Sequence, residues 1–237
     1  MVRDLVLIHS LLTDRSAFDP VLPALRERFQ LHVLPLPRGS AIEAIADSLA
    51  REIPDGAALL GNGYGGTLAL AVAARHGTRL GKLVLADAVA GFPAEGRVPF
   101  AVMREKVSAG GMSAIAEIAA RRGHSPAFLR AHPDAVDQRR AALERASPEQ
   151  FSAACTVLET VDLHPLLASI RNPTMVLVGS EDQATPPALV RRVADGIGGA
   201  RYIELPDCGH CPMLEAPAAF LDTVLPFLTG EKPRAAE

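Results

Sequence analysis

The chain has 237 residues, of which 49% are hydrophobic and 22% charged, and its formal net charge is −3. This length allows one large core, so we expect a single domain over residues 1–237. The weak charge gives no reason to expect nucleic acid or an anionic membrane as a partner, and the apolar run at residues 5–8 is too short for a signal peptide or spanning helix. We therefore expect a cytoplasmic protein.

Short apolar runs alternate with helical patterns along most of the chain. We predict strands at residues 5–8, 31–36, 57–60, 83–86, 174–178 and 201–205. Between the first of these runs, apolar residues recur three and four positions apart and predict helices at 17–29, 41–53 and 65–76. Strands that alternate with helices indicate an α/β fold with a mostly parallel sheet covered on both faces.

The stretch from about 92 to 165 breaks this alternation. It is rich in Ala and Arg, contains no convincing strand, and predicts helices at 99–108, 112–122, 134–146 and 148–160. An all-helical insertion within an α/β chain indicates a cap over the active site. We expect the charged tail from Gly230 onward to be frayed.

The segment from Gly61 to Gly66 follows a predicted strand and precedes a predicted helix. Its glycines at 61, 63 and 66 match the G-x-G-x-x-G fingerprint of dinucleotide-binding domains, with Asp87 about where a ribose-binding carboxylate belongs. The same segment also matches the G-x-S-x-G nucleophile elbow of hydrolases, except that Gly63 stands in the serine position. The two interpretations exclude each other, and the rest of the chain decides between them.

Two polar residues follow the last two predicted strands, where ligands bind in sheets of this kind. They are Asp182 and His210, in the order required for a hydrolase whose nucleophile comes earlier in the chain. Separately, each could be an ordinary turn or loop residue. Together they favour a catalytic pair, with Asp87 as an alternative partner for His210. The dinucleotide hypothesis leaves this pair and the helical insertion unexplained.

Cys208 and Cys211 have the C-x-x-C spacing of a thiol–disulfide redox site. Such a site belongs near the start of a small thioredoxin-like unit, whereas these cysteines lie near the end of a long α/β chain, so we do not predict redox chemistry. Too few ligands gather there for zinc, and the remaining histidines show no metal-binding spacing. We therefore expect neither a metal nor a cofactor.

Pairs of arginines occur in the predicted cap, at residues 121–122 and 139–140. They could recognise a substrate carboxylate, but acidic residues are interspersed among them. A solvated helix face is therefore the favoured interpretation.

The chain resembles the α/β-hydrolase superfamily, and within it the small capped hydrolases of the 3-oxoadipate enol-lactonase and carboxylesterase type. Residues 5–10 are similar to the strand and His-Gly turn of the oxyanion loop, with Ser10 in place of the usual glycine and His9 shaping the loop. Residues 59–66 are similar to the elbow, and residues 173–187 and 209–220 to the segments that carry the acid and the histidine. The resemblance covers essentially the whole chain, but an N-terminal β-hairpin seen in many relatives is absent. One sheet edge is then open or covered by a partner, which keeps a homodimer as an option.

The resemblance implies an ester or lactone of a small organic acid as the substrate. Its catalytic residues would be a nucleophile at position 63, His210 as base and Asp182 as acid, with the backbone N–H groups of Leu11 and Tyr64 forming the oxyanion hole. Because Gly63 has no hydroxyl, we expect His210 to face its Cα across a gap the size of a missing hydroxymethyl group.

Three accounts of Gly63 remain open. The first is a hydrolase whose serine was lost naturally or replaced in the laboratory. The second is an enzyme in which the Asp182–His210 dyad activates water or moves a substrate proton without a covalent intermediate. The third is a catalytically inactive protein that binds a small molecule in the capped pocket.

Overall fold

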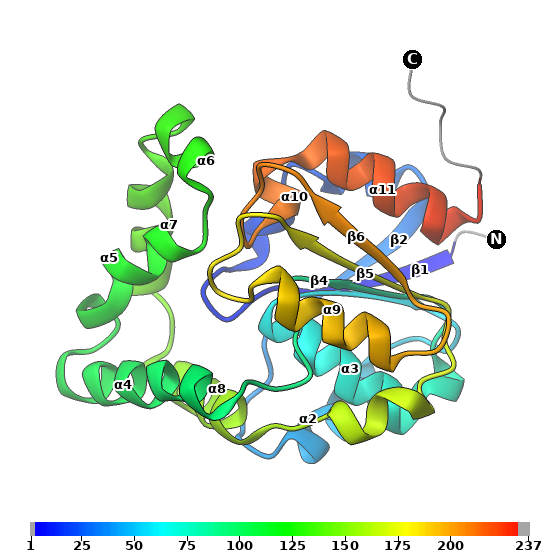
Figure 1. Cartoon of the computed structure of the whole chain (residues 1–237), viewed down its shortest axis with the longest axis horizontal. Helices are drawn as coiled ribbons and strands as arrows, with labels where there is room; N and C mark the ends of the chain where they lie inside the picture. Colours follow the sequence, from blue (N-terminus) through cyan, green and yellow to red (C-terminus); the bar gives the residue numbers. More distant parts are fainter. Residues whose placement is uncertain (1–2, 232–237) are drawn as a thin grey trace.

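The computed structural model of the chain describes residues 3–231. Six strands form one sheet in the order β2-β1-β3-β4-β5-β6, and every neighbouring pair is parallel (Figure 1). The strands are β1 (Arg3–Ile8), β2 (Phe29–Leu34), β3 (Ala58–Asn62), β4 (Leu83–Ala86), β5 (Thr174–Gly179) and β6 (Arg201–Leu205). The predicted α/β class with a parallel sheet is confirmed, and each strand begins within two residues of its predicted start.

The alternation of side chains along β1 shows why the sheet is covered on both faces. Val6 and Ile8 pack into one apolar cluster, with α2 (Ile42–Glu52), α3 (Tyr64–His76) and α9 (Pro187–Gly196). Leu5 and Leu7 pack into another, with α1 (Leu22–Arg26) and α11 (Pro217–Thr229). Figure 1 shows α11 on one side of the sheet and α3 and α9 on the other. Burial on both faces is what makes the inner strands continuous apolar runs in the sequence.

The helix predicted at residues 17–29 is wrong. The segment contains a short 3₁₀ helix, η1 (Arg15–Phe18), and the five-residue α1, and β2 already begins at Phe29. Pro20 lies between the two helices and Pro23 in the first turn of α1. A proline lacks the backbone N–H that an interior helical position donates, so two prolines three residues apart disfavour one continuous helix here. The predictions at 41–53 and 65–76 agree with α2 and α3 within one residue at each end.

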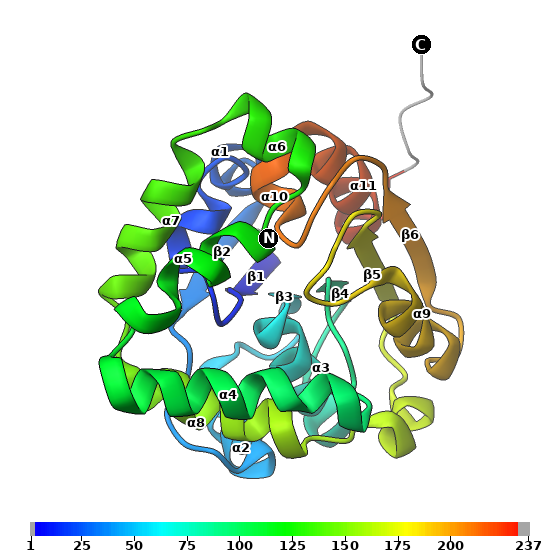
Figure 2. The same cartoon turned by 60° about the vertical axis from the view of Figure 1, so that its left-hand side comes forward.

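Five helices lie between β4 and β5 and form the insertion, which we call the cap. They are α4 (Ala94–Gly110), α5 (Ser113–Arg122), α6 (Pro126–Ala131), α7 (Ala135–Glu144) and α8 (Pro148–Thr160), followed by the 3₁₀ helix η3 (His164–Ser169). Figures 1 and 2 place α4 to α7 beside the carboxyl ends of the strands. The sequence prediction missed α6 and started α4 five residues late, because Pro99 lies inside α4 rather than before it.

The last helix of the sheet domain is α11, which ends at Gly230 with a left-handed φ of 83°. A short helix, α10 (Pro212–Glu215), precedes it. The tail predicted to be frayed falls mostly outside the described residues. Within residues 3–231, no helix has both the length and the apolar character needed to cross a membrane.

Candidate active site

Gly63 forms the sharp turn between β3 and α3. Its φ of 53° and ψ of −118° belong to a region that L-residues rarely adopt, where a side chain costs about 1–3 kcal/mol. Its N–H donates to the carbonyl of Ala86 at 2.8 Å, and its carbonyl accepts from the N–H of Thr67 at 3.0 Å. Backbone hydrogen bonds to β4 and to the first turn of α3 therefore hold this elbow without help from a side chain at position 63.

Asp182 and His210 lie side by side in the turns after β5 and β6. His210 Nδ1 is 2.8 Å from Asp182 Oδ2, and both side chains are buried. Asp182 Oδ1 accepts from the N–H groups of Ala184 at 2.7 Å and Thr185 at 3.0 Å, and the Thr185 hydroxyl lies 2.6 Å from Oδ2. Burial acts to raise the pKa of Asp182, but the electrostatic interaction with His210 and these hydrogen bonds lower the pKa below its usual value. Because an ionised carboxylate can only accept, we assign the Nδ1 proton to His210, which leaves Nε2 as an acceptor.

Asp87, the alternative partner, is not hydrogen-bonded to His210. Its carboxylate is completely buried and accepts from the N–H of Gly179 at 3.0 Å and from the side-chain amide of Asn62 at 3.1 Å. Burial and the neighbouring Asp182 carboxylate raise the pKa of Asp87 well above its usual value. The Asn62 amide also donates to the His210 carbonyl at 3.0 Å, so Asp87 and Asn62 support the turns around the site. A carboxylate buried in this way is not available to bind a ribose.

Asp87, Asp182 and His210 also form a group whose possible metal-ligand atoms lie within 4.8 Å of one another. Asp182 and His210 are already hydrogen-bonded to each other, and the Asp87 oxygens already accept from Gly179 and Asn62. The hydrogen-bond network therefore explains this cluster better than a metal site does.

The two predicted oxyanion donors come from the loop after β1 and from the elbow itself. Leu11 follows β1, and Tyr64 is the first residue of α3, where the backbone N–H has no partner within the helix and the helix dipole favours negative charge. Both line a small cavity of about 60 Å³ that Gly63 and His210 also line. The ring of His9 points back to the loop, with Nδ1 2.9 Å from the Ser10 carbonyl oxygen, in keeping with the loop-shaping role expected of it.

The hydroxyl of Ser10 lies where the sequence led us to expect a gap. Ser10 Oγ is 3.3 Å from His210 Nε2, and both groups are buried. A Cβ placed on Gly63 would lie 2.3 Å from Ser10 Oγ and 2.7 Å from His210 Nε2. The expected gap the size of a hydroxymethyl group is thus wrong, because Ser10 and the imidazole take up that space. The replacement of the usual glycine at position 10 was the one sequence signal of this contact.

A larger pocket of about 390 Å³ opens beside the small cavity, under the cap, and His210 lines both. Its walls come mainly from α4, α5 and the start of α9 and are mostly apolar. Lys106 and Arg122 are its two cationic lining residues. The apolar lining includes Leu12, Phe92, Phe100, Met103, Ile115 and Leu189.

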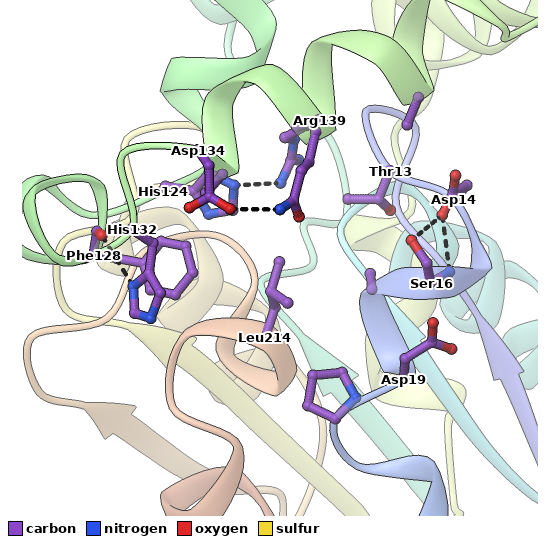
Figure 3. A pocket seen from close by; sticks show the side chains of 15 residues that line it. Thr13, Asp14, Ser16, Asp19, His124, Phe128, His132, Asp134, Arg139 and Leu214 are labelled. Carbon is purple, nitrogen blue, oxygen red and sulfur yellow. Dashed lines mark hydrogen bonds between the residues drawn. The ribbon is translucent and has the colours of Figure 1, made fainter.

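A separate hollow of about 410 Å³ lies between the segment after β1 and helices α6 and α7 (Figure 3). Asp14, Asp19 and Asp134 contribute carboxylates to its lining. None of the predicted catalytic residues lines it, so the hollow is distinct from the candidate active site.

A buried polar cluster joins the cap to the turn that carries His210. Glu215 Oε2 accepts from the N–H groups of Ser125, in the cap, and Gly209, each at 3.0 Å, and Oε1 lies 3.3 Å from His124 Nδ1. A Cβ on Gly209 would lie 2.6 Å from the Ser125 nitrogen, so only glycine allows this approach. Burial acts to raise the pKa of Glu215, but these hydrogen bonds lower it below its usual value. The position of the cap and that of the His210 turn are therefore linked.

Cys208 and Cys211 are free and completely buried. Burial raises the pKa of both thiols, whereas a redox-active thiol needs a lowered pKa. Arg139 Nη1 lies 3.3 Å from Cys211 Sγ. It also lies 3.4 Å from His124 Nε2 (Figure 3). Both cysteines belong to the apolar cluster between the sheet and helices α1 and α11.

The four cap arginines have different surroundings. Arg121 and Arg140 form exposed ion pairs with Glu117, as expected of a solvated helix face. Arg139 is buried, contrary to that expectation, because Gly123 leaves room for its guanidinium group. Arg122 is exposed, lines the apolar pocket, and donates to the Gln183 carbonyl at 3.3 Å.

Comparison with known proteins agrees with this geometry. The model of the alpha/beta hydrolase family matches residues 5–223. The pimeloyl-[acyl-carrier protein] methyl ester esterase of Aromatoleum aromaticum is 27% identical, over 90% of this chain and 93% of that protein. Among solved structures, the enol-lactonase of Burkholderia xenovorans superposes with a TM-score of 0.87 at 30% identity, over 97% of this chain and 92% of its own. A thermophilic esterase of Thermogutta terrifontis gives 0.85 at 27% identity, over 96% and 90%. The chain therefore belongs to the alpha/beta hydrolase family, and it is similar to esterases and an enol-lactonase within that fold.

Proposed function

We propose that this chain hydrolyses a carboxylic ester or lactone of a small organic acid, with His210 as the base and Asp182 as the acid that orients it. The observation that carries the proposal is the 2.8 Å contact between these two side chains, buried at the end of a capped apolar pocket. Because the Nδ1 proton of His210 is bonded to Asp182, the lone pair on Nε2 is free to take a proton from an attacking hydroxyl.

The rest of the site suits the charge that develops during ester hydrolysis. When an oxygen nucleophile adds to the carbonyl carbon, the carbonyl oxygen becomes negative, and the N–H groups of Leu11 and Tyr64 would donate to it. Asp182, kept ionised by its hydrogen bonds, would stabilise the imidazolium form of His210. His210 would then return the proton to the leaving alcohol.

The pocket lining supports an apolar acyl or alkyl group in the substrate. Aromatic and aliphatic side chains from the cap surround most of the volume of about 390 Å³, with charged side chains only at Lys106 and Arg122. Relatives named as an enol-lactonase and as esterases act on the bond types proposed here.

Hydrolysis by the purified chain tests the proposal. We expect turnover of short p-nitrophenyl esters or of small lactones, and we expect His210→Ala to abolish it. His164→Ala is the matched control, because His164 is partly exposed and is bonded to Asp162, away from the site. Hydrolysis that survives His210→Ala would contradict the assigned base.

A receptor that binds a small molecule without turning it over is the second candidate, and the missing hydroxyl at Gly63 favours it. In that case no ester or lactone would be consumed. Ligand affinity, measured by calorimetry with the non-hydrolysed acid, would stay within a few-fold of the native value in His210→Ala.

A further inference from the structure

The proton that His210 is placed to accept belongs to Ser10. Since Nδ1 of the imidazole is bonded to Asp182, the lone pair on Nε2 faces the Ser10 hydroxyl at 3.3 Å. Within residues 3–231, the Ser10 hydroxyl has no other hydrogen-bond partner, so we assign its proton to this bond, with Nε2 as the acceptor. A serine, a histidine and an aspartate thus form one chain of hydrogen bonds that starts in the loop after β1 rather than in the turn after β3.

The Ser10 hydroxyl also lies close to where an elbow serine would act. Its Oγ is 2.3 Å from the position that a Cβ on residue 63 would occupy, and it lines the small cavity together with Gly63 and Tyr64. Two side chains cannot share this volume. Glycine at position 63 is therefore what allows the Ser10 hydroxyl to reach His210.

Hydrogen bonds from neighbouring loop residues hold the Ser10 carbonyl group in place. Its carbonyl oxygen accepts from the Thr13 N–H at 3.2 Å and the Thr13 hydroxyl at 3.0 Å, and His9 Nδ1 lies 2.9 Å from it. The next residue along the chain is Leu11, whose N–H is one of the two proposed oxyanion donors. A nucleophile followed directly by an oxyanion donor is the same local arrangement that an elbow provides.

We propose that Ser10 is the catalytic nucleophile of this chain, in a relocated triad Ser10–His210–Asp182; the inference rests on the proposed ester or lactone hydrolysis. Ser10 Oγ forms a bond to the carbonyl carbon while its proton moves to His210 Nε2, and the carbonyl π electrons become the oxyanion. The tetrahedral adduct collapses with cleavage of the bond to the leaving oxygen, which takes the proton from His210. Water, deprotonated by His210, then attacks the acyl-Ser10 ester. The acid is released, and the Ser10 hydroxyl regains its proton.

Covalent labelling tests the nucleophile directly. Diisopropyl fluorophosphate forms a bond from a nucleophilic serine oxygen to phosphorus and expels fluoride, while the serine proton passes to the base. We expect the adduct on the tryptic peptide of residues 4–15, in which Ser10 is the only serine. Ser10→Ala and His210→Ala should each lower the labelling rate at least 100-fold. Ser16→Ala, a change at an exposed serine on η1, should leave it unchanged.

An exchange of the two site residues provides a second measurement. In the double variant Ser10→Gly/Gly63→Ser, the label should leave residues 4–15 and appear on the tryptic peptide of residues 52–75, which contains no serine in the native chain. Melting temperatures establish that each variant is folded. As a further variant, Ser10→Cys keeps a nucleophilic atom at this position. It should react with iodoacetamide more rapidly than the native chain does.

The outcomes separate this inference from the proposed function. Ester turnover that depends on His210 but persists in Ser10→Ala, without a label on Ser10, would overturn the nucleophile and leave hydrolysis through activated water. A label on Ser10 that depends on His210, without turnover of any ester or lactone, would support the nucleophile and overturn the hydrolase. A native chain that shows neither would overturn both.

Discussion

The sheet and the cap contribute to the candidate site in different ways. All residues of β4 and β5 are buried, and backbone hydrogen bonds hold Gly63 and Asp182 in the turns after the strands. The side-chain amide of Asn62, at the end of β3, donates to the His210 carbonyl. In α4, by contrast, Val107 is the one buried residue of 17, and Val98 is 59% exposed. The sheet therefore fixes the reacting groups, while the cap forms the pocket wall and is joined to the His210 turn through Glu215.

The largest effect is expected at the Asp182–His210 pair. Asp182→Asn keeps the size of the side chain but removes the charge and the preference for the Nδ1 tautomer. We expect kcat to fall on the order of 10⁴-fold, as loss of the aspartate does in serine proteases, with little change in KM. Glu181→Gln, at the exposed neighbouring position, is the control. A fall of less than tenfold in Asp182→Asn would mean that the sheet side of the site does not control the chemistry.

A side chain at the elbow should have the next largest effect, on stability. Gly63→Ala places a Cβ at positive φ and 2.3 Å from Ser10 Oγ, so we expect a loss of about 1–3 kcal/mol from backbone strain, with the contact adding to it. Ser10→Gly should recover part of this loss in the double variant, because it removes the contact and leaves the strain. Equal melting temperatures for Gly63→Ala and the double variant would show that the two residues do not compete for space.

Glu215→Gln probes the junction between the two regions. The Glu215 carboxylate is buried, and its pKa is lower in the folded chain than in the unfolded chain, where it is about 4.3. The ionised carboxylate therefore contributes fully to stability above the unfolded-state pKa. This contribution is lost as the pH falls through the folded-state pKa. We expect Glu215→Gln to be about 1–3 kcal/mol less stable than the native chain at pH 7, and this difference to shrink below about pH 4. Melting curves at several pH values measure it. A difference that does not depend on pH would exclude the ionised carboxylate as the link.

The smallest effect is expected at the mouth of the pocket. Arg122→Ala should raise KM two- to fivefold for esters with a carboxylate at the far end of the acyl group, and should leave kcat unchanged, because an exposed charge pair contributes about 1 kcal/mol or less. Arg121→Ala, whose native side chain is paired with Glu117 outside the pocket, is the control. A fall in kcat would show that the cap takes part in the chemistry.

The parts of the fold that follow from local pattern could be predicted from the sequence. The inner strands appear as apolar runs because both faces are buried, and the strand-end positions of Asp182 and His210 follow from the order of those strands. The helix expected at 17–29 does not form because Pro20 and Pro23 interrupt a stretch whose apolar spacing alone favours a helix. The six-residue α6 is too short to show a periodicity.

Contacts between residues far apart in the chain could not be predicted from local sequence patterns. Ser10 and His210 are 200 positions apart, and their hydrogen bond depends on the space left open at Gly63. Likewise, the burial of Arg139 depends on the absence of a side chain at Gly123, which no charge pattern reveals.

The burial of every cysteine gives this protein a practical property. Cys155, like Cys208 and Cys211, is buried, and burial raises the pKa of its thiol to about 12, so all three are poorly placed to react with maleimides in the native state. A cysteine introduced by Val102→Cys, at a pocket-lining position that is 42% exposed, would therefore take up a fluorophore selectively. The emission of that single dye would follow the arrival and departure of ligands in real time, with no other change to the chain.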